Sequence, residues 1–261
     1  MSRPTVRIFH HMARTGGTLI CKCLGSMQGV ILLSEIHPAF VHMFNPLAQA
    51  TRWFNLFSEQ QAQEFAESTP SFSQVIATIN ERCDASDLKL VIRDWSHIDF
   101  TGTPFVQKPS YRFALCDALQ ANFEIINICS VRHPIDQYLS LNALNIMQGH
   151  LNIDNYIHGY WQFARKCLET GFIRYEDFTH QPDSTLQTLC TRLRLEFDPG
   201  YTQRWRQYQT ITGDTVNTSN RIEEIRPSTP RAVDPRLLDH CAANPYYHEA
   251  LQMLGYIHPS Q

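Results

Sequence analysis

A short strand, a glycine-containing loop and a helix follow one another at the start of the chain, and this order constrains the fold most. Val6–Phe9 reads as a strand, and Gly16-Gly17 interrupts the chain after it. Apolar residues then recur with helical spacing at Leu19, Ile20, Cys23, Leu24 and Met27. Backbone N–H groups of such a loop converge on one phosphate, and the helix dipole adds to the attraction. Taken alone, Gly16-Gly17 fits equally well a plain turn ahead of a core helix.

Further short apolar runs predict the rest of a sheet. They lie at 30–33, 89–92, 125–131 and 172–175, with helical patterns between them. Continuous apolar character is typical of parallel strands that are covered on both faces. We therefore expect a three-layer α/β fold with a central, mostly parallel sheet, in which residues 1–261 form a single domain.

The segment 38–87 separates the second and third expected strands. It is polar and Gln-rich around 58–67, and Phe72, Val75, Ile76 and Ile79 then fall on one helical face. We expect a helical insertion that forms a lid or an acceptor wall at the carboxyl edge of the sheet. Further helices are expected from Pro134 to about Met147, and over 156–169 and 184–193.

Composition excludes several classes of protein. The 22 Lys and Arg residues against 25 Asp and Glu give a net charge of -3, which argues against a protein that coats nucleic acid or anionic membranes. The longest apolar runs are far below the ~18–20 residues that span a bilayer. The eight cysteines are scattered without zinc-ligand spacing, and no metal-ligand cluster is visible. We expect reduced thiols, no metal and, because 1–17 has no apolar leader core, a cytoplasmic location.

The loop lacks the Gly-Lys-Ser/Thr ending with which nucleotide-triphosphate loops bind the terminal phosphates and magnesium. Arg14-Thr15-Gly16-Gly17-Thr18 instead resembles the 5′-phosphosulfate loop of sulfotransferases that use 3′-phosphoadenosine 5′-phosphosulfate (PAPS), in which Lys or Arg precedes Ser/Thr-Gly-Ser/Thr/Gly-Thr. The resemblance implies a P-loop-like fold. It also implies that the donor binds to Arg14, Thr15, Gly16, Gly17, Thr18 and Leu19, with Arg14 neutralising the bridging oxygen.

A second motif lies in Ser130–Ser140, at the end of the fourth expected strand. It resembles the 3′-phosphate motif of the same family, Arg-x-Pro-x-Asp-x-x-x-Ser in outline. The resemblance implies that Arg132 and Ser140 bind the 3′-phosphate and that Asp136 orients the arginine. Alone, the motif fits helix capping equally well; two such motifs in this order, each after an expected strand, favour the sulfotransferase interpretation.

Two later segments extend the resemblance. Phe172–Phe178 is similar to the hydrophobic-Tyr-Glu-Asp-Leu segment of these enzymes, which implies that Tyr175 contacts the adenine; a strand end capped by Asp177 explains it as well. The loop 217–221 stands where the family closes a basic loop over the 3′-phosphate. It lacks the Arg-Lys-Gly triplet of the cytosolic enzymes, so only Arg221 is carried over.

Sulfuryl transfer needs positioned groups and a general base. Glu35 is the first candidate, because Ser34–Pro38 resembles the segment that carries the base in glycan-modifying and some bacterial sulfotransferases. His37 lies two residues further and faces the same way if the segment is extended. His97 is the third, although its spacing departs by two residues from that of the Lys-Thr-His segment in the cytosolic enzymes. Arg93 falls at the position of their lysine, which implies contact with the sulfuryl group.

The sequence thus predicts a sulfotransferase that moves a sulfuryl group from PAPS to a hydroxyl or amine, leaving 3′-phosphoadenosine 5′-phosphate (PAP). The acceptor is expected to be a small molecule, a glycan or a lipid, and no nucleic acid or membrane span is expected. Two alternatives stay open: a P-loop-type kinase, and a non-catalytic relative that binds nucleotide. The sequence carries no signature of an oligomer interface.

Overall fold

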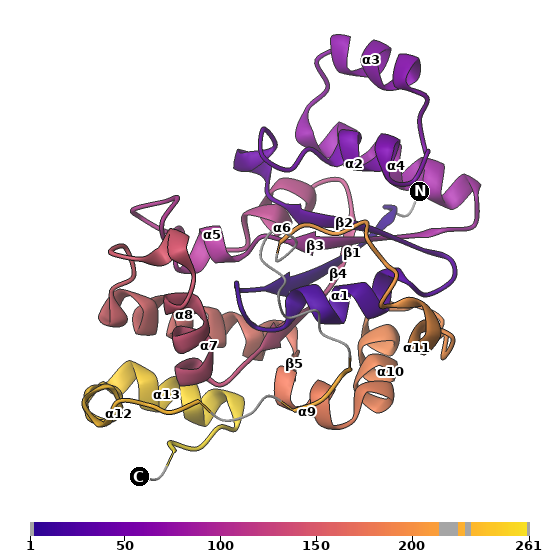
Figure 1. Ribbon diagram of the computed structural model, residues 1–261. Coiled ribbons are helices and arrows are strands. Elements are labelled where there is room, and N and C mark those ends of the chain that lie inside the picture. Colours follow the sequence, from indigo (N-terminus) through magenta and orange to yellow (C-terminus); the bar gives the residue numbers. More distant parts are fainter. Residues whose placement is uncertain (1–2, 214–223, 228–230, 260–261) are drawn as a thin grey trace.

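The computed structural model describes residues 3–213, 224–227 and 231–259. Its centre is a sheet of five strands in the order β2-β3-β1-β4-β5 (Figure 1). The strands are β1 (Thr5–His11), β2 (Val30–Ile36), β3 (Lys89–Asp94), β4 (Glu124–Val131) and β5 (Phe172–Arg174). All neighbouring strands are parallel, which confirms the predicted sheet.

The registers bring the chemically important segments to one edge. His10 is paired with Asp94 of β3, and His11 is paired with Ser130 of β4. Because the strands are parallel, the residues that follow β1, β2, β3 and β4 all leave from the carboxyl edge of the sheet. The glycine loop therefore lies between Arg132 on one side and the segment around Glu35 on the other.

One face of the sheet is covered by α1 (Gly17–Gly25), α10 (Pro182–Leu193) and α11 (Tyr201–Arg204) (Figure 1). Phe9, Leu32, Val91 and Ile128 point to this face and pack against Leu24, Leu189 and Tyr201 from the helices. Strand residues alternate between faces. Phe9 and His11 therefore belong to the α1 side, and His10 belongs to the opposite side.

The opposite face carries two groups of helices. Next to β2 and β3 lie α2 (Pro46–Arg52), α4 (Phe72–Ala85) and α6 (Ala114–Leu119), with Ile76 and Ile79 buried against Ile8 and Ile92. Next to β4 lies the long helix α8 (Ile153–Thr170), which packs against α13 (Pro245–Leu254). The remaining elements are α3 (Glu59–Glu67), α5 (His97–Phe100), α7 (Pro134–Asn142), α9 (Tyr175–His180), α12 (Pro235–Ala242), and the 3-10 turns η1 (Pro38–Phe40) and η2 (Asn145–Met147).

The predicted insertion is helical, but most of it lies on a face of the sheet. α2 packs on β2 and α4 packs on β3, because their apolar sides complete the core there. Only residues 38–45 follow the carboxyl end of β2. A lid or acceptor wall stays a prediction for this shorter segment.

Several element boundaries differ from those expected. The helix that starts at Pro134 ends at Asn142 and is followed by η2. Tyr175 does not end β5 but begins α9. The eight cysteines are free thiols, as expected.

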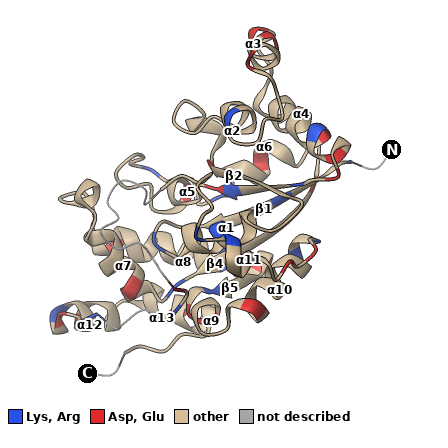
Figure 2. Cartoon of the chain, turned by 45° about the vertical axis from the view of Figure 1, so that its right-hand side comes forward, with Lys and Arg blue, Asp and Glu red and all other residues tan. Residues whose placement is uncertain are grey.

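Surface properties follow the composition. Acidic and basic side chains are interspersed on outer helices such as α4, α10 and α12 (Figure 2). Over the described parts of the chain, no helix combines the length and apolar character needed to cross a membrane.

Candidate active site

The loop between β1 and α1 turns sharply through two left-handed residues. Arg14 has φ 70° and Gly16 has φ 82°. The Thr15 hydroxyl donates to the Met12 carbonyl at 2.8 Å, which closes the turn. Gly16 caps α1 without a side-chain hydrogen bond, and the first turn of the helix holds no acidic residue. The N–H groups of this turn, those of Thr18 and Leu19 included, have no intrahelical partner, so this end of α1 favours an anion.

Gly16 is required for a second reason. A Cβ at this position would overlap the ring of Tyr175. Tyr175 therefore lies directly against the loop. The guanidinium of Arg132 lies over the same ring, 4.9 Å from its centroid. Tyr175 therefore joins the glycine loop to the second motif.

The arginines and the serine singled out in the two motifs lie together. Arg14 Nε donates to Ser140 Oγ at 2.9 Å, and Arg132 Nη1 reaches the Arg14 carbonyl oxygen at 3.4 Å. Arg132 is 9% exposed and Ser140 is 1% exposed. Arg14 is more than 100 positions away from Arg132 and Ser140 in the chain, and the three residues form one basic cluster at the carboxyl edge.

Buried and half-buried residues that the sequence reasoning missed hold this cluster in place. Gln137 of α7 donates to the Ala13 carbonyl at 2.7 Å, which ties α7 to the glycine loop. The Tyr160 hydroxyl donates to the Arg132 carbonyl at 2.7 Å. Glu176 accepts from the His133 N–H at 2.9 Å and from the Tyr256 hydroxyl at 2.7 Å. Their signal in the sequence was weak, because a glutamine or tyrosine inside a helix has no distinctive spacing.

Glu35 lies at an irregularity of β2. The register between β2 and β3 shifts between Leu33 and Ile36, and Glu35 has φ 56°. Gln49 of α2 replaces ladder partners here, since its amide binds both the N–H and the carbonyl of Ser34, at 2.7 and 2.8 Å. A left-handed residue other than glycine costs about 1–3 kcal/mol and is typical of functional sites. The bulge turns the Glu35 carboxylate toward the α1 side.

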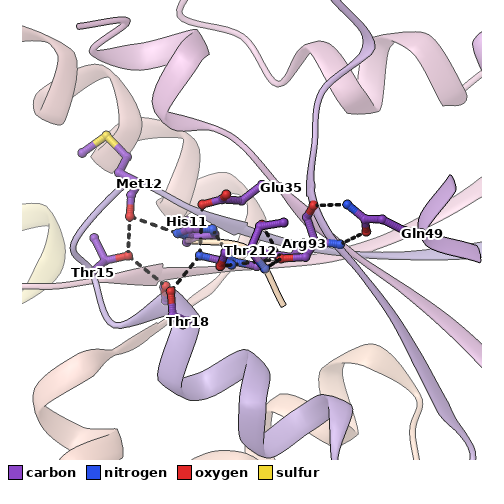
Figure 3. Close-up of polar contacts among 10 residues, drawn as sticks. His11, Met12, Thr15, Thr18, Glu35, Gln49, Arg93 and Thr212 are labelled. Atoms are coloured by element: carbon purple, nitrogen blue, oxygen red, sulfur yellow. Dashed lines mark hydrogen bonds and ion pairs between the residues drawn. The ribbon is translucent and has the colours of Figure 1, made fainter. Parts of the chain in front are cut away.

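Arg93 meets that carboxylate. Its Nη2 donates to Glu35 Oε1 at 3.3 Å and to Thr18 Oγ1 at 3.1 Å (Figure 3). Its Nη1 donates to Ser34 Oγ at 3.0 Å and to the Thr212 carbonyl at 2.9 Å. The Arg93 side chain is 3% exposed and that of Glu35 is 12% exposed. The nearly buried guanidinium of Arg93 thus links the glycine loop to Glu35. In the described structure, Glu35 is the only carboxylate that Arg93 contacts.

Several solved structures are similar to this chain in fold. No protein-family model matches the sequence, and no curated protein does either. Among solved structures, the sulfotransferase domain from the curacin biosynthetic pathway is 17% identical, with a TM-score of 0.65 over 99% of this chain and 100% of that one. The sulfotransferase domain from the Synechococcus PCC 7002 olefin synthase is 16% identical, with a TM-score of 0.68 over 99% and 98%. The chain has the sulfotransferase fold. Mouse sulfotransferase SULT7A1, solved with PAP, is 10% identical, with a TM-score of 0.50 over 97% and 89%.

Within this sulfotransferase fold, His37 lies close in sequence to Glu35 but is engaged elsewhere. Its Nε2 lies 3.3 Å from Asp99 Oδ1, and its Nδ1 accepts from the Ala39 N–H at 3.2 Å. Asp99 in turn accepts from the Ala114 N–H at 3.0 Å. His37 is 3% exposed, and its contacts join the ends of β2 and β3.

His97 is buried in a network of its own. Its Nε2 donates to the Thr103 carbonyl, and its Nδ1 accepts from the Thr101 hydroxyl, both at 2.6 Å. Burial lowers the pKa of His97 from 6.5 to about 4, and the Thr103 hydrogen bond opposes this only in part. The ring is therefore neutral at pH 7, and both of its nitrogens are already engaged, so neither is available to an acceptor substrate.

This burial predicts a pH dependence of stability. The unfolded chain takes up a proton at His97 as the pH falls through about 6.5, whereas the native chain does so only near 4. The free energy of unfolding should therefore fall by up to about 3 kcal/mol between these values through this residue alone. We expect His97→Gln, compared with the wild type by urea unfolding at pH 7 and 4.5, to reduce the decline. An equally steep decline in both proteins would contradict this assignment.

The last basic contribution comes from the C-terminal region. Arg221 lies outside the described residues. Arg231 is described and exposed; partial burial lowers its pKa, and the nearby cations Arg132 and Arg14 lower it further. Arg231 therefore lies near Arg14 and Arg132, a position that sequence reasoning did not predict. Its only signal was an arginine shortly after the polar segment 210–230.

No group of three or more His, Cys, Asp or Glu residues in the described ranges could hold a metal ion.

Proposed function

We propose that this protein is a PAPS-dependent sulfotransferase, which transfers a sulfuryl group to a hydroxyl or an amine. The observation that carries the proposal is the contact of Arg14 in the glycine loop with Ser140 of the second motif. Through it, two anion-directed motifs share one basic cluster. Such a cluster suits a nucleotide with phosphates at both its 5′ and 3′ positions, and the similarly folded mouse enzyme was solved with PAP.

The donor is proposed to lie along the carboxyl edge. Its 5′-phosphosulfate would bind the N–H groups of residues 15–19 and the Arg14 guanidinium, because both favour anionic oxygens. Its 3′-phosphate would bind Arg132 and Ser140. Tyr175, which packs on Gly16 and Arg132, would then lie between the two phosphates and contact the nucleoside.

Catalysis then requires positioning and charge neutralisation more than covalent participation by the protein. The acceptor oxygen forms a bond to sulfur as the bond from sulfur to the bridging phosphate oxygen breaks. Arg14 stabilises the charge on the departing phosphate, and Glu35 takes the proton of the acceptor hydroxyl. Glu35 is favoured over His37 and His97 because both ring nitrogens of each histidine already have partners.

The acceptor is proposed to enter beside residues 38–45. Phe40 and Phe44 from this segment pack edge-to-face on Trp95, at 5.6 and 5.1 Å between ring centroids, and Phe105 also does so at 5.1 Å. The Trp95 N–H donates to the Ile36 carbonyl, directly after Glu35. These rings are proposed to form a wall against which part of a small molecule, a glycan or a lipid binds. The protein is proposed to be cytoplasmic.

Transfer from ³⁵S-labelled PAPS tests the function. The purified protein is incubated with labelled PAPS and a panel of phenols, alkyl alcohols, amines and oligosaccharides, and labelled products are separated by chromatography. The proposal expects at least one acceptor to be labelled, and labelling to be lost in Arg14→Ala. PAPS binding without labelling of any acceptor would favour the non-catalytic relative.

A further inference from the structure

His11 is the buried group that touches the reaction centre without having been assigned a role in it. It ends β1, is 2% exposed, and points to the α1 side of the sheet. Its Nε2 accepts from Arg93 Nε at 2.8 Å (Figure 3). Its Nδ1 lies 3.0 Å from the Met12 carbonyl oxygen. The adjacent His10 points the other way and binds Asp94 at 2.6 Å.

These two contacts fix the protonation of the His11 ring. A carbonyl oxygen only accepts, so Nδ1 must carry a proton. The Arg93 Nε–H only donates, so Nε2 must be without one. Burial and the neighbouring Arg93 cation hold the pKa of His11 well below 6.5, in agreement with a neutral ring. His11 is thus an acceptor that is aimed at Arg93.

The remaining donors of Arg93 all have protein partners around the site. With Nε held by His11, Nη1 and Nη2 are directed at Ser34, Thr212, Thr18 and Glu35. An arginine presents its donors in a rigid plane, so fixing Nε fixes the direction of the others. His11 also supports the glycine loop, since a Cβ on Gly17 would overlap the His11 ring. One ring therefore contacts both the start of α1 and the arginine beside Glu35.

We propose that His11 is a positioning residue, whose neutral ring holds the Arg93 guanidinium against Thr18 of the glycine loop, where the sulfuryl group of the donor would bind, and against Glu35. This inference rests on the proposed function, because it assigns a direction to Arg93 within the donor site. It does not make His11 a proton carrier. Its consequence is that His11 affects recognition of the sulfuryl end of PAPS more than recognition of the PAP portion.

The orientation is tested without any ligand. ¹⁵N NMR of histidine-labelled protein at pH 7, with the His11 signals assigned by their loss in His11→Leu, should give a protonated Nδ1 and an unprotonated Nε2. An imidazolium or the Nε2–H form would overturn the proposal, because neither can accept from Arg93.

The consequence is tested by calorimetric affinities for PAPS and PAP. In His11→Leu, the ratio of PAPS to PAP affinity should fall about tenfold, the size of one charged hydrogen bond, while PAP affinity stays within about threefold. His11→Gln, whose amide oxygen can accept from Arg93, should recover most of the ratio. His10→Gln is the matched control, since it removes a ring from the opposite side and should keep the wild-type ratio.

The outcomes separate this inference from the function on which it rests. If wild-type protein binds neither PAP nor PAPS, the proposed function fails, and the NMR result still decides the orientation of the ring. If wild type binds both and folded His11→Leu keeps the wild-type ratio, His11 has no positioning role. An equal fall in His11→Gln and His11→Leu would also overturn the proposal, because it would mean that the acceptor atom is irrelevant.

Discussion

Arg132→Ala is expected to weaken PAP binding about 100-fold, the loss of a forked, charge-assisted contact with one phosphate. The Arg132 guanidinium lies over the Tyr175 ring, and the backbone carbonyl of Arg132 accepts from the Tyr160 hydroxyl, so both the side chain and its backbone are held in place for the 3′-phosphate. Binding of 5′-AMP, which lacks that phosphate, should change less than threefold. The ratio of the two affinities, measured by calorimetry, is therefore the informative quantity.

Two variants control for this result. Arg132→Lys keeps the charge but not the fork, and should retain part of the preference for PAP. Arg236→Ala removes an exposed arginine of α12 and should leave both affinities unchanged. Arg132→Ala protein that binds PAP as tightly as the wild type does would mean that the second motif serves helix capping only.

Glu35→Gln is expected to lower turnover by about 100- to 10 000-fold on any acceptor that the wild type sulfates, the usual contribution of a general base. The amide keeps the size of the side chain and can still accept from Arg93, so PAP affinity should stay within threefold. The measurement is the rate of PAP formation at saturating PAPS. Glu59→Gln, at an exposed carboxylate of α3, is the control.

The variant also decides among the three candidate bases. If Glu35→Gln keeps more than a tenth of the wild-type turnover, the base lies elsewhere, and His37 is the next candidate because it follows on the same segment. A loss of turnover together with a large loss of PAP affinity would instead assign Glu35 a role in shaping the donor site through Arg93.

The local part of this architecture was predictable from the sequence. Val6–Phe9 and the apolar residues after Gly17 carry the periodicity of a buried strand and a helix, and the parallel sheet followed from similar runs. The proximity of Arg14, Arg132 and Ser140 was expected from the resemblance, and the structure places them in contact. Their roles toward a nucleotide stay predictions.

The non-local part was not predictable. Glu35 faces Arg93 because of a bulge in β2 that Gln49 of α2 supports. No residue within β2 itself predicts this bulge. His11 reaches Arg93 only because β1 and β3 are neighbours in a register that pairs Phe9 with Arg93. The positions of α2 and α4 on a face of the sheet depended on how well they fill the core, which their own periodicity does not determine.

The most direct test of the central claim is calorimetric binding of PAP to the wild-type protein, beside 5′-AMP and ATP with magnesium. We predict tight binding of PAP and at least tenfold weaker binding of both other nucleotides, since only PAP places phosphates on both motifs. Preference for ATP with magnesium, or no binding of PAP, would contradict the donor site described above.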